Sequence, residues 1–204
     1  MGENIEREWD QEPLQSDLWN ALQTRKQNNG EGTAMLTDLT SRGSVLSMMY
    51  LGHAHVSSGD SDQRAQGEEL LIRSANGGSI EGRFQLALHY QLQQDYIKVV
   101  VELKVLADQG YSPAMYYLGR LLYSGDLGYK AIPEAVGYLR MAIDAGHLPS
   151  MALLSLIYRK EKFGLAGRIA SHWLCLTKIP AFVRCMWSYP SSDRLRPYGI
   201  STVA

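Results

Sequence analysis

The chain has 204 residues, of which 45% are hydrophobic and 20% are charged, so it can bury a core and is not a disordered chain. Its 20 lysine and arginine residues nearly balance its 21 aspartate and glutamate residues, which disfavours a surface built to coat nucleic acid. Two cysteines, Cys175 and Cys185, are too few for a disulfide-stapled secreted scaffold or for a four-cysteine zinc module.

The first 13 residues are strongly acidic, with five acids and one arginine among the first twelve. They lack the basic start and the apolar core of a secretory signal. The uncharged stretch at 145–158 is too short to span a bilayer and contains a glycine and a proline. We therefore expect a flexible N-terminal segment over residues 1–13 and a cytoplasmic protein.

From residue 14 onward the chain repeats itself. A half-copy occupies residues 18–43, and further copies begin at four glycines spaced 35, 32 and 36 residues apart, namely Gly43, Gly78, Gly110 and Gly146. The segment YLGHAHVSSGD at 50–60 matches YLGRLLYSGD at 117–126 in the same frame. Repeats of this length indicate stacked supersecondary units, none of which can bury its apolar face alone.

Each copy is predicted to contain two amphipathic helices. In the clearest copy, apolar residues at 115–122 follow the helical spacing, and the second helix ends on the next of the four glycines. A glycine there suits a left-handed C-cap, and Pro113 and Pro149 then fall at the start of the following helices. Small residues such as Gly52 and Gly119 would let the two helices of a pair approach closely.

This pattern resembles the Sel1-like repeat (SLR) family, a relative of the tetratricopeptide repeats, over about residues 14–180. The family's repeat reads approximately A-x-x-x-L-G-x-x-Y-x-x-G and then A-x-x-x-L-x-x-A-A-x-x-G, and the best copy here matches it at Ala114, Leu118, Gly119, Gly125, Ala135, Leu139, Ala142 and Gly146. The copy after Gly78 is degenerate, and the last copy lacks its terminal glycine.

The resemblance implies an all-α fold, a right-handed α-solenoid of four to five stacked antiparallel helix pairs. This repeat domain would cover residues 14–187 with a C-terminal capping helix, and a flexible tail would follow at 188–204. SLR proteins are usually adaptors, so the resemblance implies a non-enzymatic protein that binds a protein or peptide in a concave groove. The first helix of each pair would line that groove.

By analogy with related repeats, the groove positions are Met49, His53, Phe84, Leu88, Tyr116, Arg120, Tyr123 and Arg159. Aromatic, methionine and arginine side chains are enriched at protein interfaces. The alternative for the aromatic residues is packing against the next repeat, and the sequence favours neither interpretation over the other. The two arginines are expected to be exposed.

The basic C-terminal end leaves a second function open, that of a regulatory or inhibitory subunit that binds one enzyme or toxin. From residue 159 onward there are eight basic and two acidic residues, and Arg184, Arg194 and Arg196 are among the basic ones. These residues could contact an acidic partner, RNA or an anionic membrane. Because they form no clustered run, a solvated solenoid cap is the favoured interpretation. Nucleic acid is disfavoured as a partner, and peripheral membrane contact is not favoured.

No residue pattern predicts a catalytic, metal or cofactor site, and we expect no enzyme activity. His53 and His55 are two residues apart, about 200° around a helix, so they could not share a metal ion. The acidic segment at 60–71 imitates a calcium loop but has Ala65 where that loop requires glycine. Cys175 lies in an apolar run, which favours a buried, inert thiol over a reactive one or one paired with Cys185.

Overall fold

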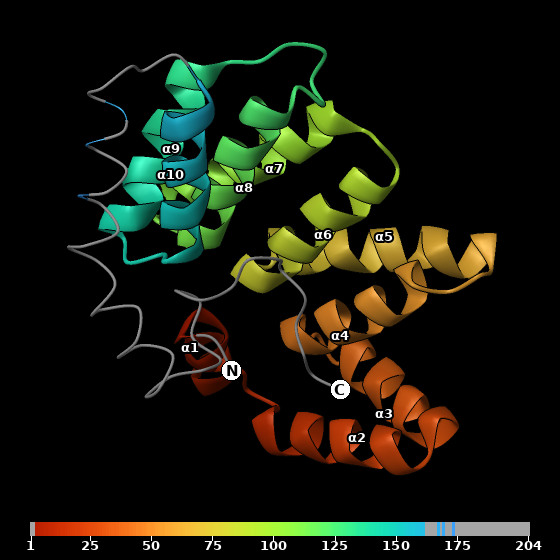
Figure 1. Cartoon of the computed structure of the whole chain (residues 1–204). Coiled ribbons are helices and arrows are strands. Elements are labelled where there is room, and N and C mark those ends of the chain that lie inside the picture. The colour runs from red at the N-terminus through yellow and green to blue at the C-terminus, as the bar shows by residue number, and fades with distance from the viewer. Residues whose placement is uncertain (1–2, 162–166, 168, 170–172, 174–204) are drawn as a thin grey trace. The chain divides into compact units, whose positions relative to one another are not determined.

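The computed structural model describes residues 3–161 together with residues 167, 169 and 173. Within these residues the chain forms α-helices and no strand (Figure 1). The helices are α1 (Glu3–Gln11), α2 (Gln15–Gln27), α3 (Asn29–Ser41), α4 (Val45–Val56), α5 (Ser61–Asn76), α6 (Ile80–Leu92), α7 (Tyr96–Asp108), α8 (Ser112–Ser124), α9 (Ile132–Asp144) and α10 (Pro149–Lys160). The all-α fold predicted from the sequence is confirmed.

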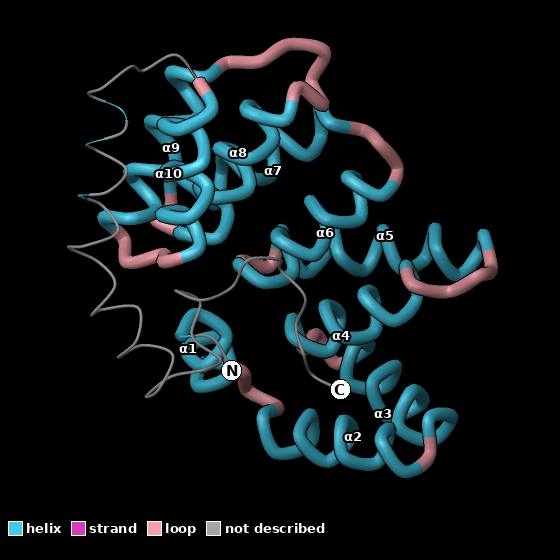
Figure 2. The backbone as a smooth tube through the Cα atoms, viewed as in Figure 1, coloured by secondary structure: helices cyan, strands magenta, loops and turns pink. Residues whose placement is uncertain are grey.

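The described helices fall into two compact units. The first runs from Glu3 to Asp95 and contains α1 to α6, and the second begins at Tyr96 and contains α7 to α10. In the first unit α2 packs on α3, α4 on α5, and α6 on both α4 and α5, while α1 contacts α6. In the second unit α8 packs on α7 and α9, and α10 packs on α9 and α8. Within each unit, helices thus pack mainly on their neighbours in the chain, joined by the loops drawn in Figure 2, as in stacked helix pairs.

Leucines from successive helices form the core of each unit. Fully buried leucines in the first unit include Leu18, Leu36, Leu46 and Leu71, and in the second Leu103, Leu106, Leu118, Leu139 and Leu154. The close approach predicted at the small residues is present. A Cβ atom at Gly52 would lie 3.0 Å from the carbonyl oxygen of Gly67, and one at Gly119 would lie 2.7 Å from Cγ of Leu139.

The four glycines that mark the repeat end helices in the left-handed conformation. Gly43, Gly78, Gly110 and Gly146 have φ between +84° and +93°. At each of them the glycine N–H bonds the carbonyl three residues back, and the next N–H bonds the carbonyl five residues back. This is the Schellman motif, which satisfies the last carbonyls of a helix. The predicted C-caps are therefore confirmed.

Gln94 takes the place of the glycine at the end of α6. Its φ is +61°, and the N–H of Asp95 bonds the carbonyl of Tyr90 at 3.0 Å, as in the four glycine caps. A side chain in this conformation is strained by about 1 kcal/mol. We expect Gln94→Gly to raise the free energy of unfolding by about 1 kcal/mol in urea titrations followed by circular dichroism. Gly110→Ala should lower it by a similar amount, and no gain from Gln94→Gly would contradict strain at this cap.

The helix starts also have local causes in the sequence. Four helices are capped by a side chain that accepts a hydrogen bond from an N–H of the first turn. These residues are Asn28, Ser44, Asp60 and Ser79. Helices α8, α9 and α10 instead have a proline in the first two positions, where a missing N–H leaves no bond unmade. The predicted roles of Pro113 and Pro149 are confirmed.

The N-terminal segment differs from the flexible chain expected over residues 1–13. Its described residues Glu3–Gln11 form α1, and Trp9 is 6% exposed. The indole N–H of Trp9 donates to the Tyr50 hydroxyl at 3.3 Å, and Glu8 accepts from the Ser79 hydroxyl at 2.5 Å. These partners are 41 and 71 residues away in the sequence, so local composition did not reveal them.

Several predicted features lie outside the described residues. They are the end of the capping helix, the tail at 188–204, both cysteines (Cys175 and Cys185) and the basic residues Arg184, Arg194 and Arg196.

Candidate partner-binding surface

Three of the four predicted groove residues of the second unit lie on one face of α8. Tyr116, Arg120 and Tyr123 follow the i, i+4, i+7 spacing, which places their side chains along a single stripe. Pro113 lies in the first turn of this helix, and Gly125, with φ of +87°, ends it. The stripe is therefore fixed by signals local to the α8 sequence.

Arg120, which the sequence predicts to be exposed, is instead half-buried and stacks on an aromatic ring. Its guanidinium carbon is 4.7 Å from the centroid of the Tyr117 ring, a cation–π geometry. Its Nε is buried and has no hydrogen-bond partner among the described residues. Because Nε has no accessible surface, only the remaining, half-exposed part of the Arg120 side chain is available to a partner.

Tyr123 lies one turn further along α8 and is also half-buried. The Lys130 ammonium is 5.4 Å from its ring centroid. Burial and the neighbouring Glu161 carboxylate, which accepts a hydrogen bond from the phenol, raise the pKa of Tyr123 above its usual value of 10.0. Tyr123 therefore keeps its proton at neutral pH and presents an uncharged ring beside Arg120.

Tyr116 is buried beneath this surface. It is 8% exposed, its ring is 5.1 Å from the His147 ring, and it meets the Tyr117 ring edge-on at 6.0 Å. For this residue the structure favours packing within the unit over direct contact with a partner. Arg159, on α10, is exposed as the sequence predicts.

Of the predicted groove residues of the first unit, two are buried and two are half-buried. Met49 and Phe84 are 1% and 0% exposed, so they belong to the core and present no surface. His53 on α4 and Leu88 on α6 are half-buried and stay predicted contacts. Burial lowers the pKa of His53 below 6.5, Glu81 opposes this shift, and Arg25 adds to it. His53 is thus a neutral imidazole at pH 7.

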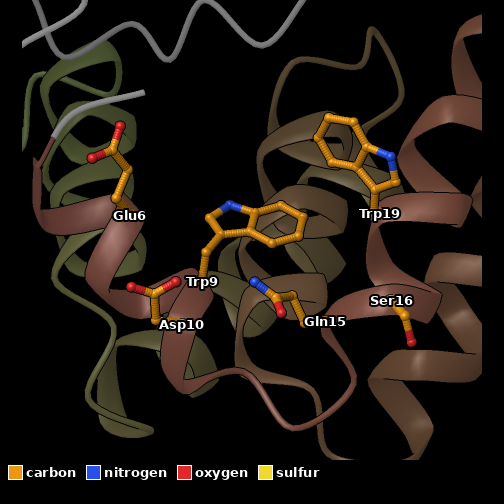
Figure 3. Close-up of a pocket in the computed structure, with 6 residues that line it drawn as sticks. All are labelled: Glu6, Trp9, Asp10, Gln15, Ser16 and Trp19. Atoms are coloured by element: carbon orange, nitrogen blue, oxygen red, sulfur yellow. The ribbon is translucent and has the colours of Figure 1, made fainter.

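Sequence reasoning missed a pocket in the first unit, between α1 and α2. It has a volume of about 450 Å³ and is lined by Glu6, Trp9, Asp10, Gln15, Ser16 and Trp19 (Figure 3). The two tryptophans, ten residues apart in the sequence, were the available signal. A flexible segment over residues 1–13, as the sequence predicts, would leave Trp9 without a fixed position beside Trp19.

Within the described part of the chain, no group of three or more histidine, cysteine, aspartate or glutamate side chains is arranged to hold a metal ion. The Nδ1 atom of His55 is buried without a hydrogen-bond partner there, and Cβ of the same residue lies beside Gly67, where α4 crosses α5. A search of the same residues for a helix with the length and hydropathy of a membrane span found none.

The packed helix pairs form a helical-repeat fold, and comparison with solved structures shows that this fold is similar to that of SLR proteins. One similar structure is c5321, a protective antigen present in uropathogenic Escherichia coli strains that displays an SLR fold; the TM-score is 0.58 and the identity 23%, over 72% of this chain and 34% of that one. Another is a Sel1 repeat protein from Oxalobacter formigenes, with a TM-score of 0.65 and 18% identity, over 81% of this chain and 72% of that one.

The present chain therefore spans about a third of the length of the c5321 protein. No family model and no curated relative matches the sequence. At these identities the likeness establishes the fold, and the SLR fold predicted from the repeats is confirmed at that level.

Proposed function

We propose that this chain is a non-enzymatic adaptor that binds a protein or peptide partner through the α8 face formed by Arg120 and Tyr123. The observation that carries the proposal is that the half-exposed guanidinium of Arg120, held 4.7 Å from the centroid of the Tyr117 ring, lies on the same helix face as the half-exposed Tyr123. A helical-repeat fold supports it, because stacked helices present side chains of successive first helices to a bound chain.

The chemistry of this face suggests what it would bind. Arginine offers planar N–H donors that match a carboxylate or a backbone carbonyl, and tyrosine adds large contact area at a small entropic cost. Arginine and tyrosine are also the types that dominate interface energetics when they are partly desolvated. A peptide that places an acceptor oxygen on Arg120 and an apolar side chain on Tyr123 fits both groups.

The test is affinity capture from a cytoplasmic extract, the compartment we propose, comparing the wild type with the double variant Arg120→Ala, Tyr123→Ala. Tyr116 is left intact because its removal would open a cavity in the core. For a partner that the wild type captures, we expect the double variant to weaken the affinity about 30-fold or more in calorimetric titration.

The matched control is Lys104→Ala with Tyr138→Ala, which removes one cation and one tyrosine from the second helices α7 and α9. It should bind the partner like the wild type. Circular dichroism of all three proteins verifies the fold. Equal affinity of the Arg120/Tyr123 variant and the wild type would reject the α8 face as the binding surface.

A further inference from the structure

The pocket between α1 and α2 combines aromatic walls with negative charge. Trp9 and Trp19 meet nearly perpendicular, at 77°, with ring centroids 6.2 Å apart. Glu6 and Asp10 supply two carboxylates, and none of the six lining residues is basic. Figure 3 shows Trp9 extending from α1 toward α2, with Trp19 beyond it and the acidic residues on the α1 side.

One wall of this pocket is rigid and the other is open. Trp9 is fixed by its hydrogen bond to the Tyr50 hydroxyl at 3.3 Å and by its packing on the Tyr50 ring, with centroids 6.2 Å apart. Trp19 is 52% exposed although it is a large apolar residue. An indole that is half-exposed beside a fixed one leaves a ring face available for a ligand.

The geometry points to a binding site for a basic side chain, an arginine or lysine of a partner polypeptide. Indole faces attract organic cations, and tryptophan is the ring that does so best. Asp10 adds a charge of the complementary sign at the rim. The volume of about 450 Å³ lies within the range of roughly 300–1,000 Å³ of small-ligand sites and suits one long side chain. This inference rests on the first unit alone and stands independently of the α8 face.

The probes are Nα-acetyl-arginine amide and Nα-acetyl-lysine amide. Their controls are the citrulline amide, which keeps the length of arginine without its charge, and the norleucine amide, which keeps the four side-chain carbons of lysine without its ammonium. The readout is the indole N–H signal of Trp19 in ¹⁵N–¹H spectra, assigned with Trp19→Phe. We expect saturable shifts with the cationic amides, with Kd on the order of 1 mM for ligands of this size. The citrulline and norleucine amides should produce no saturable shift.

Two variants test the residues. Asp10→Asn should weaken binding of the arginine amide about 2–5-fold, and Trp19→Ala, followed through the Trp9 indole, should do the same. Glu69→Gln is the matched control, because it removes one exposed negative charge from the first unit away from the pocket. It should bind like the wild type.

Three results would overturn the inference, provided that circular dichroism shows folded proteins. The first is an equal shift with the citrulline and arginine amides, which would leave no role for charge. The second is unchanged binding to Asp10→Asn. The third is tighter binding of choline than of either amide, which would assign the pocket to a free small cation.

Discussion

Gly67→Ala is expected to lower the free energy of unfolding of the first unit by about 1–3 kcal/mol, because α4 and α5 cross at this residue. A Cβ atom at Gly67 would lie 2.6 Å from the backbone nitrogen of Val56 and 2.8 Å from the carbonyl oxygen of Gly52. Both are backbone atoms, which cannot rotate away as a side chain can. The two helices must therefore separate and lose contacts among their buried residues. Urea denaturation followed by far-ultraviolet circular dichroism measures the loss.

Gly137→Ala on α9 is the matched control for this substitution. A Cβ atom there meets nothing within 4 Å, so only the higher helix propensity of alanine remains. The variant should gain about 0.5–1 kcal/mol. If glycine-to-alanine substitution lowers the free energy of unfolding at Gly67 and raises it at Gly137, the distance between the crossing helices decides the effect. A Gly67→Ala protein as stable as the wild type would contradict the tight α4–α5 crossing.

The helices and their caps could be predicted from the sequence because the forces that fix them are local. Gly43, Gly78, Gly110 and Gly146 end helices through left-handed φ values that glycine adopts without strain, so their recurrence revealed the repeat. The cap at Gln94 could not be predicted from the sequence, because this residue adopts the left-handed conformation although it has a side chain. The structure shows it to be a cap only through its φ of +61° and the bonds around it.

The N-terminal helix could not be predicted in this way. Its acidic composition is typical of a solvated segment, and what orders it lies far along the chain. Trp9 bonds Tyr50, Glu8 bonds Ser79, and the Glu12 carboxylate accepts from the Leu46 N–H at 3.2 Å. No pattern within residues 1–13 encodes these tertiary partners. The pocket between α1 and α2 was missed for the same reason.

For the candidate groove, the sequence predicted which residues share a helix face but not the direction in which that face points. Spacing placed Tyr116, Arg120 and Tyr123 on one face of α8, as the structure has them. Spacing alone did not tell how far that face turns into the core. Tyr116, Met49 and Phe84 proved to be buried, because each lies on the side of its helix that meets other helices.

A second large effect is expected from the two carboxylates that attach α1. Glu8 and Glu12, one turn apart, accept hydrogen bonds at the N-terminal ends of α6 and α4. Carboxylates stabilise helix N-termini, where N–H groups lack partners inside the helix. Replacing both with alanine should cost about 2–4 kcal/mol, the sum of two lost caps, and should release α1. The indole N–H signal of Trp9, buried in the wild type, reports the release.

Gln11→Ala, at an exposed position at the end of α1, is the control for helix propensity and should leave the Trp9 signal in place. The Ser79 hydroxyl also accepts from the Gly82 N–H at 2.8 Å, so α6 keeps its own cap in the double variant. The effect should therefore be confined to α1. Unchanged docking in the double variant would show that Trp9 packing alone holds this helix.

Glu8 also gives this attachment a pH dependence. Burial is the largest cause that raises its pKa above 4.5, and the nearby Glu81 carboxylate adds to it, while the bonds from Ser79 and the Glu81 N–H oppose it. A carboxyl group whose pKa is raised by docking binds its proton more tightly when docked. The proton-linked part of its contribution to docking is thus fully present below pH 4.5 and is lost as the pH rises through the raised pKa, while the hydrogen bonds that it accepts remain.

Glu8→Gln separates this charge effect from the hydrogen bonds. Its carbonyl accepts from the Glu81 N–H and its amide donates to the Ser79 oxygen, so the neutral side chain keeps both contacts without a charge to desolvate. We expect Glu8→Gln to dock α1 at pH 7 at least as well as the wild type and to lose the pH dependence that Glu8 contributes above pH 4.5. The Trp9 indole signal, recorded through a pH titration of both proteins, measures the difference. If Glu8→Gln kept the wild-type slope, the proton would belong to another group, and Glu8 would attach α1 as a plain carboxylate cap.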